Sequence, residues 1–173
     1  MKSIKMTIKP NGELVLPEAH FSTLQGLFYE LLSFDPVLSD EVHGMRSGKT
    51  DAIKQFCFSD LHYPCGSSRG SAFYKSSFTF EVRSANDPII ETIERSVNDD
   101  PLIVINGHEC EIINYRVSST VFLSNSFDMR MDSPITVYRS NKRRDYYSQS
   151  DPEFYEIVKN NLLKKYLLAY GEA

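Results

Sequence analysis

The stretch LQGLFYELLSFDPVLSDEVHGMRSGKTDAIKQFCF, residues 24–58, contains two helical segments followed by a strand. It places Tyr29 on the flank of the first helix, His43 at the end of the second and Lys54 at the entry to the strand. A phenol, an imidazole and an ammonium are groups that a metal-free enzyme could use to move two protons and stabilise a phosphorane. The stretch therefore predicts a candidate catalytic site.

Apolar spacing around this stretch predicts its helices. Within residues 22–34 the apolar side chains recur at i, i+3, i+4, i+7 and i+8, which is typical of an amphipathic helix packed on a sheet; they are Leu24, Leu27, Phe28, Leu31 and Leu32. Tyr29 lies about 120° from the centre of that stripe at 100° per residue, so it can leave the core. Asp35-Pro36 predicts the start of a second helix over residues 36–43.

The surrounding elements predict a ferredoxin-like fold. Alternation or β-rich composition predicts strands over 3–9, 55–59 and 72–82, with loops over 44–51 and 63–70. Asp87-Pro88 opens a further helix, and Asn106-Gly107 joins strands 102–105 and 109–117 in a hairpin. The order β-α-β-β-α-β predicts an α+β, ferredoxin-like (RRM-type) domain over residues 1–118.

A second, incomplete ferredoxin-like domain is predicted over residues 133–173, after a linker at 119–132. PITVYR, residues 134–139, reads as its first strand. Ser150 and Glu153 have the spacing of a capping box, and the helix they open is predicted to run to Tyr170 and end at Gly171. A lone strand and helix cannot bury a core. We expect them to dock on the first domain, to pair with a second copy in a homodimer, or to continue into a longer protein.

Composition is that of a globular cytoplasmic protein. Hydrophobic residues make up 41% and charged residues 24%, and no apolar run approaches the roughly 20 residues of a membrane helix. Cys57, Cys65 and Cys110 are odd in number and have no C-x-x-C spacing, which favours reduced thiols and argues against zinc. No metal or cofactor is predicted.

The net charge and the local charge clusters lead to opposite expectations about nucleic-acid binding. The net charge of −4 argues against a simple nucleic-acid binder, which usually carries a basic footprint. Basic residues nevertheless cluster locally. Arg46 and Lys49 follow His43, and Lys142, Arg143 and Arg144 form a run that could contact phosphate or could be a solvated hairpin tip.

The segments LQGLFYELL, DPVLSDEVH and KQFCFS occur in the order seen in Cas6, the CRISPR-associated endoribonucleases that cut repeat RNA. A later block, with Ser133-Pro134-Ile135, Asp151-Pro152-Glu153-Phe154, Asn160-Asn161-Leu162 and the ending KYLLAYG, resembles the strand and helix that open that family's second domain. The resemblance covers nearly the whole chain. The family's glycine-rich loop near its C-terminus is missing here, so the chain resembles an N-terminal portion of a Cas6 protein, with a degenerate member as the alternative.

The resemblance implies metal-independent cleavage of CRISPR repeat RNA. A ribose 2′-OH would attack the adjacent phosphate and give a 2′,3′-cyclic phosphate and a 5′-OH. Tyr29 matches the family's helix tyrosine, His43 its histidine and Lys54 its lysine, with Lys49 as the rival lysine. Partners would be repeat RNA and proteins of a CRISPR effector complex.

Each residue also has a structural interpretation. Tyr29 could be an ordinary helix-flank aromatic, His43 a residue favoured by the helix dipole, and Lys54 a lysine that protects a strand edge. His20, His62 and His108 are expected on the surface or in turns. Two other functions remain open: a related protein that binds repeat RNA without cutting it, and a ferredoxin-like interaction module unrelated to RNA.

Overall fold

The computed structural model describes residues 1–17, 19–44, 55–61, 66–68, 70–121, 137–139 and 145–171. Lys54, Arg46, Lys49, Lys142, Arg143 and Arg144 therefore lie outside the described residues, as do His62 and Cys65. The chain divides into two compact units, Met1–Val121 and Phe122–Ala173. Within the described ranges, no helix combines the length and apolar character needed to cross a membrane.

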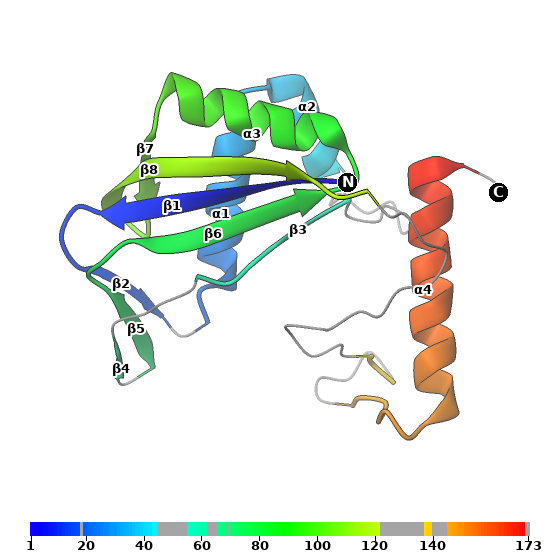
Figure 1. The fold of residues 1–173 in the computed structure, drawn as a ribbon. Helices are drawn as coiled ribbons and strands as arrows, with labels where there is room; N and C mark the ends of the chain where they lie inside the picture. Colours follow the sequence, from blue (N-terminus) through cyan, green and yellow to red (C-terminus); the bar gives the residue numbers. More distant parts are fainter. Residues whose placement is uncertain are drawn as a thin grey trace. The chain divides into compact units, whose positions relative to one another are not determined.

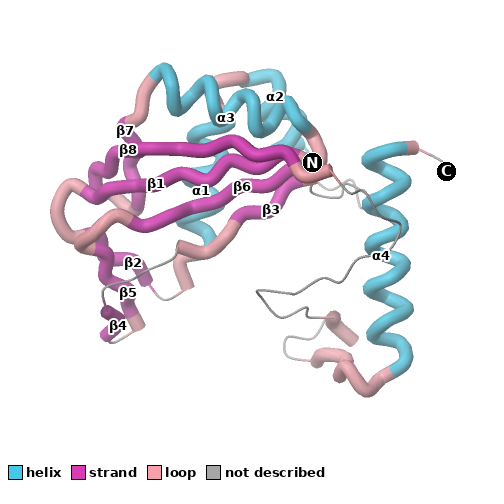
Figure 2. Tube along the Cα trace, viewed as in Figure 1, coloured by secondary structure: helices cyan, strands magenta, loops and turns pink. Residues whose placement is uncertain are grey.

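The first unit is an α+β fold built on a five-stranded antiparallel sheet (Figures 1 and 2). The strand order is β3-β6-β1-β8-β7. The strands are β1 (Lys2–Pro10), β3 (Phe56–Phe58), β6 (Phe78–Ser84), β7 (Leu102–Ile105) and β8 (His108–Ser119). On the central strand Ile4, Met6 and Ile8 are fully buried while Lys5 and Lys9 are exposed, so one face of the sheet forms the core.

Three helices belong to this unit: α1 (Phe21–Leu32), α2 (Pro36–Gly44) and α3 (Asp87–Asp99). Helices α1 and α3 contact each other, and they lie against the buried face of the sheet (Figure 2). The predicted stripe of α1, from Leu24 to Leu32, is buried, and Ile89, Ile90 and Ile93 of α3 are buried beside it. The sequence predictions of these helices are confirmed to within two residues.

The β7–β8 hairpin also forms as predicted. Ile105 pairs with His108, and Asn106 and Gly107 both have positive φ, 51° and 79°. That combination is the type I′ turn that Asn-Gly favours, because glycine and asparagine adopt the left-handed region at little cost. The hairpin fixes the register of β7 on β8.

The prediction of one strand over 72–82 is wrong. The segment divides into β5 (Ser71–Tyr74) and β6, which belong to different sheets. Lys75, Ser76 and Ser77 between them are exposed. A second, three-stranded sheet has the order β2-β5-β4, with β2 (Leu14–Pro17) and β4 (Gly66–Ser68), neither of which was predicted. Residues 66–68 were expected in a loop; backbone pairing with β5, not side-chain pattern, makes them a strand.

In the second unit the described residues form helix α4 (Pro152–Tyr170), which ends at Gly171 as predicted. The predicted strand 134–139 is not seen in its described part, 137–139, where Tyr138 makes only an isolated bridge to Tyr146. The predicted capping box is also wrong. Asp151 is the N-cap, and its carboxylate accepts hydrogen bonds from Arg139 at 2.6 Å and the Ser148 amide at 2.8 Å. Because Pro152 begins the helix, Ser150 lies one residue too early to cap it.

Candidate active site

Tyr29 and His43 come together in the first unit. Their ring centroids are 3.8 Å apart and their planes are inclined by 24°, which is a stacked arrangement. Tyr29 is half-buried on the flank of α1 and His43 is exposed in the last turn of α2. Both side chains are described, and no hydrogen bond joins them. The two predicted residues thus share one site although 13 residues separate them in the chain.

Helix α2 is held in place at its start and along its buried side. The Leu38 amide donates to Asp35 Oδ1 at 3.1 Å, which caps the helix as the Asp-Pro signal predicts. Leu38 and Val42 are buried in the core. His43 follows Val42, so the burial of its neighbour directs the imidazole outward over Tyr29.

A row of aromatic rings supports Tyr29 from behind. The Phe28 ring is 5.2 Å from the Tyr29 ring and stacks on Phe56 at 4.0 Å. Phe56, in β3, is itself 6.3 Å from Tyr29 in an edge-on arrangement. The phenol is therefore fixed by α1 and β3 together. Sequence reasoning assigned Phe56 only to a strand, because nothing in its spacing indicates a contact with α1.

The entry to β3 is anchored as well. The carbonyl of Gln55 accepts hydrogen bonds from Ser84 Oγ at 2.9 Å and from the Ala85 amide at 3.2 Å. Gln55 directly follows Lys54 in the sequence. The backbone next to the candidate lysine is thus tied to the end of β6, although Lys54 itself lies outside the described residues.

His20 lies in a turn, one of the two positions expected for it, but its side chain is buried. It is 7% exposed, with Nδ1 2.8 Å from the Pro17 carbonyl and Nε2 2.7 Å from Asp60 Oδ1. Both ring nitrogens thus have an oxygen partner within hydrogen-bonding distance. His20 is also the N-cap residue of α1. The pair therefore ties the start of the helix that carries Tyr29 to the segment after β3. His108, in contrast, is partly exposed beside the hairpin turn, as predicted.

Metal-ligand clusters of three or more His, Cys, Asp or Glu side chains are absent from the described residues. Cys110 is buried, and desolvation raises the pKa of its thiol to about 11, while Cys57 is exposed. The imidazole of His43 and the phenol of Tyr29, which the structure brings together, are both groups able to transfer protons.

Comparisons with known proteins find similarity to Cas6 proteins. The family model described as CRISPR associated protein Cas6, C-terminal, matches residues 117–173. A CRISPR-associated endoribonuclease Cas6 from Pyrococcus furiosus is 25% identical over 163 residues, which is 91% of this chain. The chain spans 60% of the length of that curated relative.

Solved structures share the fold. A CRISPR associated protein Cas6 superposes with a TM-score of 0.69 at 19% identity, over 99% of this chain and 72% of the other. A Cas6-related protein from Pyrococcus furiosus gives 0.72 at 16% identity, over 98% and 71%. A RAMP protein described as binding different RNA substrates gives 0.70 at 18% identity, over 100% and 73%.

Because residues 117–173 match the family's C-terminal part, the expectation that the chain corresponds only to an N-terminal portion is too narrow. The chain is thus similar to the C-terminal family model of Cas6 over residues 117–173 and to a Cas6 endoribonuclease, at 25% identity, over 91% of its length.

Proposed function

We propose that this chain is a metal-independent endoribonuclease that cleaves CRISPR repeat RNA, with Tyr29, His43 and Lys54 as its catalytic residues. The observation that carries the proposal is the stacking of Tyr29 on His43 at 3.8 Å, in a chain related to Cas6. Two groups able to transfer protons are thereby placed next to each other at the surface, where a phosphate can reach them.

The reaction needs a base for the 2′-OH, an acid for the departing 5′-oxygen and a cation for the charge on the phosphorane. His43 acts as the acid and protonates the 5′-oxygen as the P–O bond breaks. Tyr29 orients the 2′-OH or removes its proton. Lys54 supplies the cation; the 6.3 Å approach of Phe56 to Tyr29 supports it over Lys49, because Phe56 follows Lys54 by two residues.

We also propose the finer domain assignment. Residues 1–118 would form a ferredoxin-like domain, 119–132 a linker and 133–173 the beginning of a second such domain. The order β3-β6-β1-β8 with α1 and α3 on one face supports the first assignment, and the unit boundary at Val121 is compatible with the linker. Arg46, Lys49, Lys142, Arg143 and Arg144 would contact the RNA backbone, and proteins of a CRISPR effector complex are candidate partners.

End-labelled repeat RNA incubated with the chain in EDTA tests the proposal. We expect one product that ends in a 2′,3′-cyclic phosphate, and no product when the nucleotide at the cut carries a 2′-deoxyribose. At a protein concentration that saturates the RNA, Lys54→Ala should slow the cleavage step strongly, whereas Lys49→Ala, which removes only a proposed backbone contact, should not. Equal losses in both variants would remove Lys54 from its assigned role.

Binding without cleavage is the alternative function. The RAMP structure of the same fold, described as binding different RNA substrates, motivates it. If both the unchanged chain and His43→Ala shift intact RNA on a native gel, and neither yields product at any time, the chain binds repeat RNA without cutting it. If the chain neither cleaves nor binds the RNA, the function that remains is that of an interaction module unrelated to RNA.

A further inference from the structure

Strand β7 forms one edge of the five-stranded sheet (Figure 1). It reads Leu-Ile-Val-Ile over residues 102–105. Natural sheets protect an edge strand by keeping it very short, by bulges or covering elements, or by placing a lysine or a proline within it. Neither residue occurs in β7, although Pro101 precedes it.

The register of the hairpin shows which backbone groups of β7 point outward. Ile105 and His108 flank the two-residue turn, so they exchange hydrogen bonds, and pairs alternate from there along the ladder. Val104 and Glu109 are therefore a non-hydrogen-bonded pair, and so are Leu102 and Glu111. It follows that the N–H and C=O of Val104 and the C=O of Leu102 point away from β8. The Leu102 amide is occupied, because it donates to Asp100 Oδ1 at 2.9 Å.

Apolar side chains line the same edge. Leu102 is 67% exposed and Val104 51% exposed, whereas the alternate residues Ile103 and Ile105 are buried. Ile113 is 48% exposed on β8, at the bulge opposite Thr7 and Ile8. Open backbone groups and exposed aliphatic side chains thus occur together, which is what a docking peptide strand requires.

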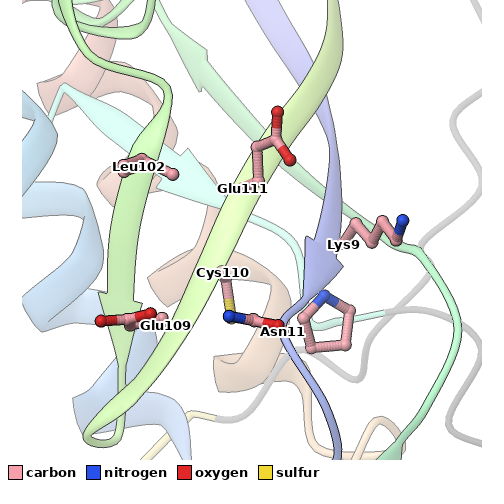
Figure 3. A pocket seen from close by; sticks show the side chains of 7 residues that line it. Lys9, Asn11, Leu102, Glu109, Cys110 and Glu111 are labelled. Atoms are coloured by element: carbon pink, nitrogen blue, oxygen red, sulfur yellow. The ribbon is translucent and has the colours of Figure 1, made fainter.

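An acidic depression adjoins this apolar edge. It has a volume of about 260 Å³ and lies where β1 ends and where β7 and β8 begin (Figure 3). Its lining includes Glu109, Glu111, Leu102 and Lys9. Among the described residues neither glutamate forms an ion pair, and Asp99 and Asp100 are exposed just before β7. Carboxylates therefore outnumber cations around the edge.

We propose that the β7 edge binds an extended segment of a partner protein, which adds to the sheet as a further strand. Its apolar side chains would cover Leu102 and Val104, and its lysine or arginine side chains would reach the carboxylates of Glu109 and Glu111. Leu102 and Val104 share the exposed face of the sheet with their register partners Glu111 and Glu109. The partner that fits best therefore carries both apolar and basic side chains on one face, at every second residue. A second copy of this chain fits less well, because it would bring a net charge of −4 and the same carboxylates to the interface.

A pair of peptides tests the backbone part of this proposal. The parent probe is a ten-residue peptide with valine and lysine by turns at the odd positions and threonine at the even positions, and its two isomers are N-methylated either at every odd or at every even position. All three carry the same charge, but each isomer blocks a different edge of the peptide strand. We expect one isomer to bind like the parent and the other at least tenfold more weakly. Equal binding by both isomers, or no binding of the parent at millimolar concentration, would overturn the proposal.

Variants of the full chain test the protein side. Val104→Pro removes an N–H that β8 does not use, so it should weaken parent binding at least tenfold while the β7–β8 pairing persists. Val104→Thr keeps the N–H and the side-chain shape and should bind like the unchanged protein. The double variant Glu109→Gln, Glu111→Gln should weaken binding several-fold. If Val104→Pro does not fold, the comparison of the two N-methylated peptide isomers tests the proposal by itself. A dimer in sedimentation that Val104→Thr preserves and Val104→Pro abolishes would replace the partner segment by a second copy.

Discussion

Helices α1 and α4 differ in what covers them. In α1 the apolar side chains from Leu24 to Leu32 are no more than 2% exposed. In α4 Phe154 is buried near the start of the helix, but several larger apolar side chains are exposed, including Tyr155 at 60%, Leu162 at 52% and Tyr166 at 50%. The three share one face of α4, since they are seven and four residues apart. Apolar side chains at similar spacing are therefore buried in α1 and exposed in α4. Burial depends on the layer against which a helix packs, and α1 packs against a sheet.

This difference explains why the candidate site lies on α1. A catalytic side chain must be held in a narrow range of positions, which requires neighbours that are themselves packed. Phe28 and Phe56 fix Tyr29 in this way, and Asp35, Leu38 and Val42 fix the helix that carries His43. The described part of α4 offers no comparable support.

The largest expected effect on this comparison is at Phe28. Phe28→Ala should lower the free energy of unfolding of the first unit by about 3–5 kcal/mol, because it empties a fully buried site and removes the ring stacked on Phe56. Urea denaturation followed by circular dichroism would measure the loss. A loss below 1 kcal/mol would show that α1 is not packed as described.

Thiol reactivity gives the next largest effect. A pKa of about 11 in place of 9.0 lowers the thiolate fraction of Cys110 at pH 8 about 100-fold, and burial slows the reaction further. Alkylation of a variant that retains only Cys110 should therefore be slow. The reaction should speed up as the pH rises towards the raised pKa, because more thiolate forms. A variant that retains only Cys57, which is exposed, is the matched control; equal rates for the two would contradict the burial of Cys110.

His20→Ala should cost about 1–3 kcal/mol of unfolding free energy, because it removes a buried imidazole whose two nitrogens contact the Pro17 carbonyl and the Asp60 carboxylate. Thermal melting at pH 6 and pH 7 would measure the loss. The matched variant His108→Ala, at a partly exposed turn position, should melt within a few degrees of the unchanged protein. Equal melting of the two variants would mean that the His20–Asp60 contact stabilises nothing.

The smallest effect is expected on α4. Leu162→Ala should change the free energy of unfolding by no more than about 0.5 kcal/mol, as is usual for exposed positions. Urea denaturation under the same conditions as for Phe28→Ala would compare the two losses of unfolding free energy directly. A loss of 2 kcal/mol or more would show that α4 is covered in solution.

Local signals predict much of this fold. Periodicity gives α1 and α3, Asp-Pro gives the start of α2, and Asn-Gly gives the β7–β8 turn. The signals fail where a partner decides the structure. Residues 66–68 have no strand pattern and pair only because β5 lies beside them, and the break at 75–77 separates two sheets that share one run of aromatic residues.

The candidate site shows the same division. The flank position of Tyr29 follows from helical spacing, and the helix-end position of His43 follows from Asp35-Pro36. Their stacking does not follow, because it depends on the angle between α1 and α2 that the short turn at Ser33–Asp35 sets. The contact between His20 and Asp60 could not be predicted either, since 40 positions separate the two residues and neither has a motif.

Cleavage of repeat RNA in EDTA by His43→Ala, compared with His108→Ala, tests the central claim most directly. We predict that His43→Ala lowers the single-turnover rate about 10²–10⁴-fold, as is usual when a general acid is lost, and that His108→Ala leaves it unchanged. The two variants should bind the RNA equally well. Cleavage by His43→Ala at the rate of the unchanged protein would contradict the assignment of the stacked Tyr29–His43 pair as the catalytic site.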